Sequence, residues 1–325
     1  MAKMRFNNVY LEDYITLAGP EEYKGKIKNY NIVLKDFYYG MNTFEQAEIK
    51  MQKTVIEEIM NKNRLKDEDV NYLIGGDLIN QISISSYAAK EFKIPFIGIY
   101  SACSTFTESL IVASVLVENK YASKTLCVTS SHNLTAERQF RYPVEYGYTR
   151  PQTSTTTATG AACSLVSNKV GKYKIVAATI GKIVDLGIND VNHMGAVMAP
   201  ACADSLHEHL KNNKQKLQDY DLILTGDLGC VGVDILCQYY EKVYGEKINN
   251  IIDSGCELYL PNQDVGSGGS GPACLPLYLF TKVLKNKKYH HILILGTGSL
   301  HSPVLVNQHQ TIPSISHAVE IEVIS

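Results

Sequence analysis

The sequence lacks an excess of charge of either sign. Its 325 residues contain 31 Lys and Arg against 33 Asp and Glu, which leaves a formal net charge of −2. Proteins that bind nucleic acid or anionic lipid normally carry a basic patch or a basic net charge. We therefore expect no nucleic-acid partner, and charge alone indicates no other partner.

Long hydrophobic runs are also missing. No stretch approaches the ~18 apolar residues that predict a membrane span. The first residues, MAKMRFNNVYLEDY, lack the unbroken apolar core of a signal peptide. We expect a soluble chain, and any attachment to a membrane should depend on a partner.

Metal-ligand and disulfide spacings are absent from the sequence. The eight cysteines form no CxxC or paired pattern, and no HExxH motif is present. The cysteines lie singly in apolar segments such as TLCVTS and DILCQYY. We expect eight reduced, cytosolic thiols and no resident metal or cofactor.

Short apolar runs alternate with amphipathic helical patterns. Helices are predicted over 43–63, where Thr43 and Gln46 have capping-box spacing, and over 104–120. Strands alternating with helices of this length predict an α/β fold with a largely parallel sheet. The predicted buried strands cover 70–78, 96–100, 125–131, 173–181, 220–229 and 291–300.

The second half of the chain repeats the plan of the first. GGDL and TGDLG end corresponding strands, and each is followed by a helix, a loop of small residues, an apolar helix and another strand. SACST precedes CVTSS by the same distance as GGSGP precedes ILGTG. We favour duplication over the general likeness of two βαβ units. The predicted halves are 1–170, with Cys103, and 171–325, with the Gly-rich loop.

Cys103 stands among small residues in IGIYSACSTF, between an apolar strand and an apolar helix. The N–H groups of a first helical turn carry partial positive charge, which stabilises a thiolate or an anion brought close to it. The small neighbours would let a ligand approach. Cys103 is therefore a candidate functional residue, whereas the other seven cysteines are interpreted as packing residues.

Other candidates follow the same reasoning. Asp77 and Asp227 end corresponding strands, where ligands gather in open α/β sheets, although capping the next helix explains either one equally well. His193 and His301 lie in loops rich in small residues and could assist the cysteine. The Gly-rich run VGSGGSGPA could hold an anion but fits no nucleotide motif. Four further histidines are expected to be solvated: His207, His209, His290 and His291.

These features together resemble the thiolase and ketoacyl synthase superfamily. The strings GINDVNHMGAVMAPACAD, IGIYSACSTFTESL, YLIGGDLINQ and DVGSGGSGPACLPLYL more closely resemble the stage V sporulation protein AD family of spore-forming bacteria. The resemblance implies an α/β, thiolase-like fold of two pseudo-duplicated βαβ halves packed as a five-layered αβαβα sandwich. It also implies a homodimer formed through the first-half sheet.

The sequence departs from the condensing enzymes of that superfamily. These enzymes pair the nucleophilic cysteine with two His, or with His and Asn, after the strand matched by LILTGDLG and in the Gly-rich loop. The stretch 226–229 contains no imidazole, and 268–270 contains neither His nor Asn. LGTGSL stands where biosynthetic thiolases have a second reactive cysteine. We therefore expect a protein that retains the binding pocket of these enzymes but does not carry out their condensation reaction, and that has no catalytic residues.

The resemblance implies a non-catalytic subunit of a spore membrane channel. Such a subunit would bind dipicolinic acid, pyridine-2,6-dicarboxylate, with calcium carried along in some cases, for uptake in sporulation and release in germination. Its partners would be the other stage V sporulation A subunits, and it would lie peripherally on the spore inner membrane, in forespore and spore. The predicted ligand contacts are Cys103, Asp77, Ser104, Asn192, His193, Met194, Gly268 and Gly269.

Two alternatives stay open at this point. One is an active acyl-transferring, ketoacyl synthase-like enzyme that uses Cys103 with an unusual base such as His301. The other is a ligand-free scaffold whose fold only docks membrane subunits.

Overall fold

The computed structural model describes residues 4–324. Within them, each half of the chain forms five main strands, which we call the first sheet and the second sheet. The two sheets join edge to edge through a short contact between their first strands. The first set runs in the spatial order β2 (Tyr10–Ala18), β8 (Gly160–Ser167), β6 (Lys124–Ser131), β4 (Tyr72–Gly76) and β5 (Phe96–Gly98). The second runs β9 (Tyr173–Ile180), β14 (Ser314–Val323), β13 (His291–Ser299), β10 (Leu222–Thr225) and β11 (Ile251–Asp253).

Both halves follow one strand order. Counted along the chain, each set is arranged first, fifth, fourth, second, third. In both sets the fifth strand, β8 or β14, runs antiparallel to its two neighbours. This shared topology confirms the pseudo-duplication, because two unrelated α/β units need not place five strands alike.

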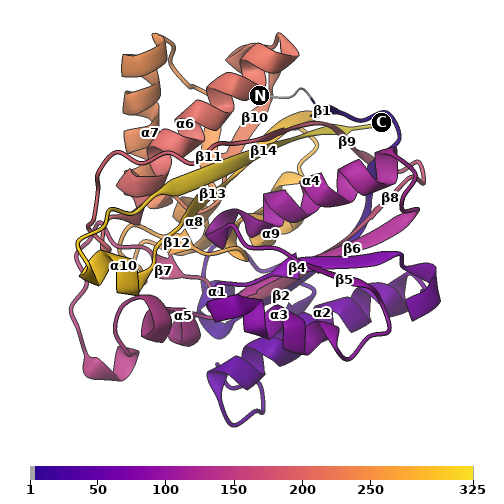
Figure 1. Ribbon diagram of the computed structural model, residues 1–325, viewed down its shortest axis with the longest axis horizontal. Helices are drawn as coiled ribbons and strands as arrows, with labels where there is room; N and C mark the ends of the chain where they lie inside the picture. The colour runs from indigo at the N-terminus through magenta and orange to yellow at the C-terminus, as the bar shows by residue number, and fades with distance from the viewer. Residues whose placement is uncertain (1–3, 325) are drawn as a thin grey trace.

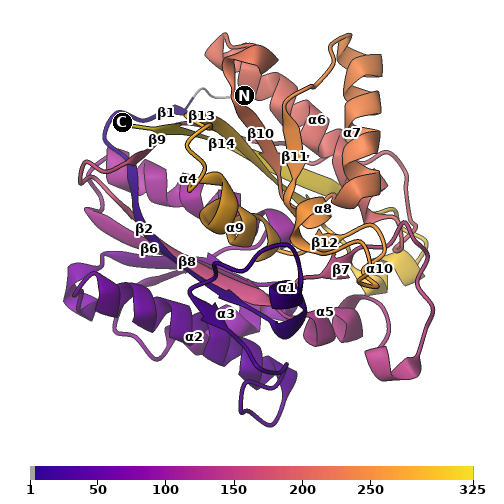
Figure 2. The same ribbon diagram turned by 180° about the vertical axis from the view of Figure 1, so that it is seen from behind.

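Helices complete a sandwich of five layers, αβαβα (Figures 1 and 2). The outer face of the first sheet is covered by α2 (Phe44–Lys62) and α3 (Ser83–Ala89). The outer face of the second sheet is covered by α6 (Met194–Asn213) and α7 (Gly229–Tyr244). Between the two sheets lie α4 (Thr105–Glu118) and α9 (Cys274–Tyr278). The predicted fold class is confirmed.

Short elements gather at one end of the sandwich (Figure 1), where the candidate site described below is built. These are α5 (Asn133–Phe140), α8 (Ser254–Leu258), α10 (Pro303–Asn307), β7 (Thr156–Thr157) and β12 (Gly269–Ser270). The remaining elements are β1 (Met4–Arg5), β3 (Ile32–Val33) and α1 (Pro20–Lys24).

Local sequence explains both predicted helices. Thr43 Oγ1 accepts a hydrogen bond from the Gln46 backbone N–H at 3.2 Å, which caps the start of α2. Helix α4 packs against both sheets, so its predicted apolar face is buried and so is most of the rest of the helix. Phe106 and Leu110 belong to the core that joins the two sheets.

All six predicted strands are present, but the sheet is more mixed than expected. Of the ten main strands, β2, β8, β11 and β14 were not predicted. Every residue of β8 is buried, and its sequence GAACSLVS shows no alternation of polar and apolar residues. A strand made of small residues and buried on both faces gives no periodic signal, which is why β8 escaped prediction.

One expectation about the cysteines is wrong, because Cys230 and Cys256 form a disulfide with Cα atoms 4.8 Å apart. They lie in the first turns of α7 and α8. The Asp253 carboxylate accepts hydrogen bonds from the N–H groups of Gly229 and Cys256, so one buried side chain draws both helix starts together. A sequence separation of 26 residues could not reveal this proximity.

The expectation of four solvated histidines is wrong for His209. Its side chain is fully buried where α6 packs on the second sheet, with Nδ1 2.9 Å from Thr179 Oγ1 and Nε2 3.2 Å from the Tyr220 hydroxyl. In the part of the chain from 4 to 324, no helix has the length and apolar character that crossing a bilayer requires.

Candidate functional site

Cys103 lies at the start of the central helix α4, in the single turn Ala102–Ser104. Ala102 has φ +51°, a left-handed conformation that is uncommon outside glycine and often marks functional sites. Strand β13 passes directly beside this turn, because a side chain at Gly298 would overlap the Ser101 carbonyl oxygen. The thiol is partly exposed.

The Gly-rich loop of the second half faces Cys103. Ser270 Oγ lies 3.7 Å from Cys103 Sγ. In the alignment of SACST with GGSGP, Cys103 and Ser270 occupy the same position of the repeat. Corresponding residues of the two halves therefore meet at the candidate site.

Asp227 follows strand β10 and faces the same thiol. Its Oδ1 accepts a hydrogen bond from Thr297 Oγ1 at 2.7 Å, whereas Oδ2 is buried and has no hydrogen-bond partner among the described residues. Burial, and to a lesser extent the neighbouring Asp253 carboxylate, raise the pKa of Asp227 to about 8. Asp227 is therefore mostly protonated at neutral pH and can donate a hydrogen bond, as a neutral carboxylic acid does.

The environment of Cys103 opposes ionisation. Burial first, and then the Asp227 carboxyl, raise the pKa of the Cys103 thiol above its ordinary value. The helix start was expected to stabilise a thiolate, but desolvation outweighs the helix dipole at this position. Cys103 is accordingly a neutral thiol and a poor nucleophile.

A cavity of about 60 Å³ lies over Cys103. This is more than the ~10–15 Å³ that one water molecule requires, so the cavity can admit water or a small polar group such as a carboxylate. Its lining residues come from both halves of the chain. They are Leu78, Tyr100, Ala102, Cys103, Ala136, Phe140, Arg141, Thr157, Met194, Met198, Ser270, Ser299 and His301.

Arg141 brings a positive charge to this cavity, and sequence reasoning missed it. Its side chain is only 10% exposed, and Nη1 donates to Glu137 Oε1 at 2.8 Å and to the Thr155 carbonyl oxygen at 3.2 Å. Nε is buried and has no hydrogen-bond partner within residues 4–324. Arg141 lies in no recognisable motif, and the near-neutral net charge of the chain gives no indication of a local positive charge.

His301 also lines the cavity and lies outside the predicted contact set, although the sequence analysis names it as a candidate partner of the cysteine. Its Nε2 bonds the Phe140 carbonyl oxygen at 3.1 Å and must donate, which leaves Nδ1 as an unprotonated nitrogen. That nitrogen is buried without a partner in the described part of the chain. Burial, with Arg141 close by, lowers the pKa of His301.

Of the eight predicted contacts, the structure brings Cys103 and Met194 into the cavity. Ser299 Oγ donates to Met194 Sδ at 3.0 Å, which holds the thioether beside the thiol. The other six residues do not line this cavity, so their role in binding a ligand stays a prediction. They are Asp77, Ser104, Asn192, His193, Gly268 and Gly269.

Internal packing explains several of these six. Asp77 accepts hydrogen bonds from the Ile79 and Ser85 backbone N–H groups and from the Ser85 hydroxyl, at 2.7–2.8 Å, and so supports the start of α3. Gly268 packs against α8, because a side chain there would lie 2.6 Å from the Gly255 carbonyl oxygen. Ser104 is fully buried.

Asn192 and His193 lie in the loop before α6. Thr153 Oγ1 donates to the Asn192 backbone carbonyl at 3.1 Å, and His193 occupies the position before the first residue of the helix. Asn192 Oδ1 and His193 Nδ1 are buried without hydrogen-bond partners among residues 4–324. The loop therefore has spare polar groups near Met194, its neighbour in the chain.

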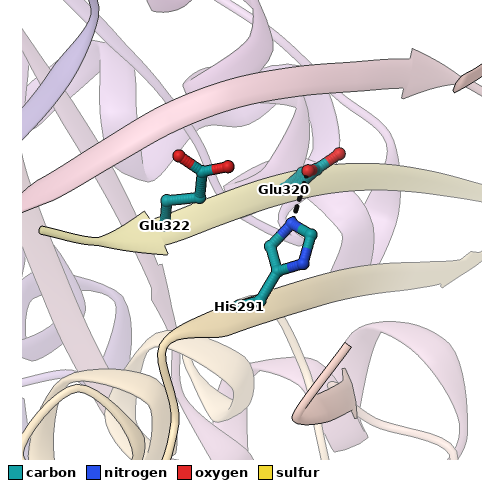
Figure 3. A group of neighbouring side chains, drawn as sticks. All are labelled: His291, Glu320 and Glu322. Carbon is teal, nitrogen blue, oxygen red and sulfur yellow. Dashed lines mark hydrogen bonds and ion pairs between the residues drawn. The ribbon is translucent and has the colours of Figure 1, made fainter. Parts of the chain in front are cut away.

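Three side chains far from Cys103 could in principle hold a metal ion: His291, Glu320 and Glu322, each with a ligand atom within 4.8 Å of the others (Figure 3). However, Glu320 Oε1 already lies 2.6 Å from His291 Nε2 and accepts from Gln215 Nε2 at 3.0 Å. Although burial opposes it, hydrogen bonds from His209, His291 and Gln215 hold the pKa of Glu320 well below its ordinary value, and the bond to Glu320 raises the pKa of His291. We assign this group as a buried ion pair.

Two duplicated halves with a cysteine at the start of a shared central helix define the thiolase-like class. Solved structures agree with this fold. A variant of OleA from Xanthomonas campestris matches with a TM-score of 0.62 over 99% of this chain and 100% of that chain, at 13% identity. A 3-oxoacyl-[acyl-carrier-protein] synthase III from Aquifex aeolicus matches with a TM-score of 0.56 over 98% and 99%, at 14% identity.

Sequence comparison is more specific. The family model for stage V sporulation protein AD matches residues 3–322. The chain is 39% identical to stage V sporulation protein AD of Bacillus subtilis strain 168 over 318 residues, which cover 97% of this chain and 94% of that protein. The chain belongs to the stage V sporulation protein AD family, as its sequence motifs predicted.

Proposed function

We propose that the protein is a non-catalytic, dipicolinic acid-binding subunit of a spore membrane channel. In this role it would act in uptake of dipicolinate during sporulation and in its release during germination. The observation that carries the proposal is the cavity over Cys103, which offers positive charge and hydrogen-bond donors suited to a carboxylate, whereas no base among the described residues forms a hydrogen bond with the thiol.

The groups around the thiol argue against condensation. A condensing enzyme needs a thiolate and partners that stabilise an oxyanion and move protons. Cys103 is held neutral, and its immediate neighbours are a hydroxyl, Ser270, and a carboxyl already protonated at neutral pH, Asp227. Neither can accept the thiol proton.

The same groups suit a carboxylate ligand. Arg141 supplies a buried positive charge with an unpartnered N–H, and Ser270 supplies a hydroxyl on the cavity wall. The turn before α4, whose Ala102 and Cys103 line the cavity, adds the partial positive charge of a helix start. Leu78, Phe140 and Met198 give the cavity apolar walls.

The channel context rests on family membership. The ligand-loaded chain would dock on the membrane subunits of the stage V sporulation A assembly and lie peripherally on the spore inner membrane. Calcium would travel with dipicolinate rather than reside in the protein. A homodimer through the first-half sheet belongs to the same proposal.

Titration calorimetry with dipicolinate, with and without calcium, tests the binding proposal. The wild type should bind, and Cys103→Leu should bind at least about tenfold more weakly, because the larger side chain fills the cavity. Cys127→Ala, a change at a buried free thiol in β6, is the matched control and should bind like the wild type. Melting curves verify that each variant folds.

Two results would count against this proposal. Normal binding by Cys103→Leu would show that the ligand does not bind in the Cys103 cavity. Absence of both heat and a thermal shift with the wild type would favour the ligand-free scaffold.

Acyl transfer is the second candidate, because His301 presents an unprotonated nitrogen in the Cys103 cavity. Incubation with acyl-CoA followed by intact-mass measurement decides it. We expect no adduct. A stable acyl adduct that disappears in both Cys103→Ala and His301→Phe would establish the enzyme instead.

A further inference from the structure

A larger cavity lies beside the Cys103 cavity and has not been used so far. Its volume is about 350 Å³, several times that of its neighbour. Arg141 lines both cavities, so one guanidinium stands at their boundary. We call the larger space the outer cavity. It is lined by Glu137, Arg141, Tyr142, Pro143, Gly147, Tyr148, Thr149, Arg150, Pro151, Gln152, Ser154, Asp264, Val265 and Gly266.

Two arginines in the outer cavity share a single carboxylate. Arg141 Nη1 and Arg150 Nη1 donate to the same oxygen, Glu137 Oε1, at 2.8 and 3.2 Å. Glu137 is only 4% exposed. The cluster therefore carries one net positive charge in a partly buried place, where an incoming anion is attracted more strongly than at an open surface. Asp264, also on the wall, is exposed and screened by solvent.

The outer cavity also contains donors that lack acceptors. Arg141 Nε and Ser154 Oγ are buried and have no hydrogen-bond partner within residues 4–324. Buried donors without partners are rare, because each costs free energy in the folded protein. Two of them on one cavity wall, next to surplus positive charge, indicate that an acceptor arrives with a ligand.

Aromatic side chains form another part of the wall. The rings of Tyr142 and Tyr148 lie 5.3 Å apart between centroids, and Tyr146 stacks on Tyr142 at 5.7 Å. Tyr142 and Tyr148 line the outer cavity. Such rings provide flat apolar surface against which a planar ligand can pack.

We propose that the outer cavity is a second carboxylate subsite, in which Arg150 and Ser154 hold one carboxylate of a planar aromatic dicarboxylate whose other carboxylate lies over Cys103. The ring rests against Tyr142 and Tyr148, and Arg141 lies between the two carboxylates. The Cys103 cavity, at about 60 Å³, is much smaller than the outer cavity, at about 350 Å³, so we assign one carboxylate to the smaller space and the ring to the larger one. The choice of ligand rests on the proposed function.

The test compares a dicarboxylate with its monocarboxylate analogue, dipicolinate with picolinate, by titration calorimetry on the full chain. Arg150→Gln should weaken dipicolinate binding about tenfold or more, as loss of one charge-assisted hydrogen bond does, and change picolinate binding less than about twofold. Arg141→Gln should weaken both ligands, because Arg141 contacts either carboxylate position. Arg141→Lys keeps the charge and should recover part of the affinity.

Arg138→Gln is the matched control, since Arg138 lies in α5, just before Arg141 in the chain, and pairs with Glu45 away from both cavities. It removes one positive charge and should leave both affinities unchanged. Thermal melting shows whether Arg141→Gln folds, and Arg150, whose side chain is 31% exposed, can be replaced at little structural cost.

The outcomes separate this inference from the proposed function. If the wild type binds dipicolinate and Arg150→Gln binds it equally well, the outer subsite is wrong and the proposed function stands. Equal weakening of dipicolinate and picolinate by Arg150→Gln would also overturn the subsite, because it would show a general charge effect. If the wild type binds neither ligand, both proposals fail together.

Discussion

The two halves of the molecule use the same local plan for different purposes. Strand β4 leads into Asp77, and strand β10 leads into Asp227, the corresponding residue of the repeat. Asp77 accepts three hydrogen bonds inside the first half. Asp227 keeps one oxygen unbonded and faces Cys103. The first half therefore uses its aspartate to build a helix start, whereas the second half contributes its aspartate to the site.

The corresponding loops also differ, and here the first half supplies the functional candidate. In the first half the loop carries a thiol, Cys103, and in the second half the corresponding loop carries Ser270 within a run of glycines. Duplication explains why the candidate site lies where corresponding loops meet. It also shows that corresponding positions cannot be assigned the same role from sequence alone.

The largest expected difference between the halves concerns the glycines before the two aspartates. A side chain at Gly76 would overlap the backbone carbonyl oxygen of Ile99, whereas one at Gly226 would meet the Leu275 side chain at 3.1 Å. Gly76→Ala should lower the free energy of unfolding by about 3 kcal/mol or more, and Gly226→Ala by about 1 kcal/mol or less. Urea denaturation measures both. Equal losses would show that the halves tolerate crowding alike.

The aspartates themselves should differ next. Asp77→Asn removes acceptors from Ser85 and should lower the free energy of unfolding by about 2 kcal/mol at neutral pH. Asp227→Asn should raise the free energy of unfolding at this pH, because the amide is close in shape to the protonated acid and, unlike the wild-type carboxyl, stays neutral in the unfolded chain. Denaturant titration of both variants at pH 7 provides the measurement. A larger loss for Asp227→Asn would contradict the assigned roles.

A further difference should appear in the pH dependence of stability. The pKa of Asp227 is about 8 in the folded chain, above the ordinary value of about 4 that it regains on unfolding. Between these values the folded state binds the extra proton, so stability is highest at low pH and falls as pH rises towards and through 8. Asp227→Asn should flatten this fall, measured as the free energy of unfolding from pH 5 to 9. An unchanged slope would mean that Asp227 is ionised throughout.

The last prediction concerns the rates at which two cysteines react with an alkylating reagent, and the expected difference is small. Cys103 lies in the turn before α4 and Cys274 begins α9, and burial raises the pKa of both thiols. At pH 7 neither should react appreciably with iodoacetamide, and at higher pH Cys103 should react first, because it alone of the two is partly exposed. Mass spectrometry of timed samples gives the rates. Rapid labelling of Cys103 at pH 7 would point to a thiolate and revive the acyl-transfer alternative.

Prediction from sequence succeeded where the signal was local. Apolar runs indicated six of the ten main strands, although one of them, β9, proved antiparallel to its neighbours, and helical periodicity and the Thr43 cap indicated α2. The repeat indicated the duplicated halves, and the small residues around Cys103 indicated a helix start at a cavity. It failed for β8, which has no alternation, and for the Cys230–Cys256 bond, whose partners meet only because Asp253 joins two helix starts.

The candidate site shows the same difference between what local sequence predicts and what tertiary contacts decide. The sequence by itself determined the fold class, the repeat and the position of Cys103, because these depend on the order and spacing of residues along the chain. Only the tertiary structure decided which groups surround the thiol, since Arg141, Asp227 and Ser270 come from three separate segments. It also decided that Cys103 stays neutral, because burial depends on what packs above a residue and here outweighs the field of the helix start.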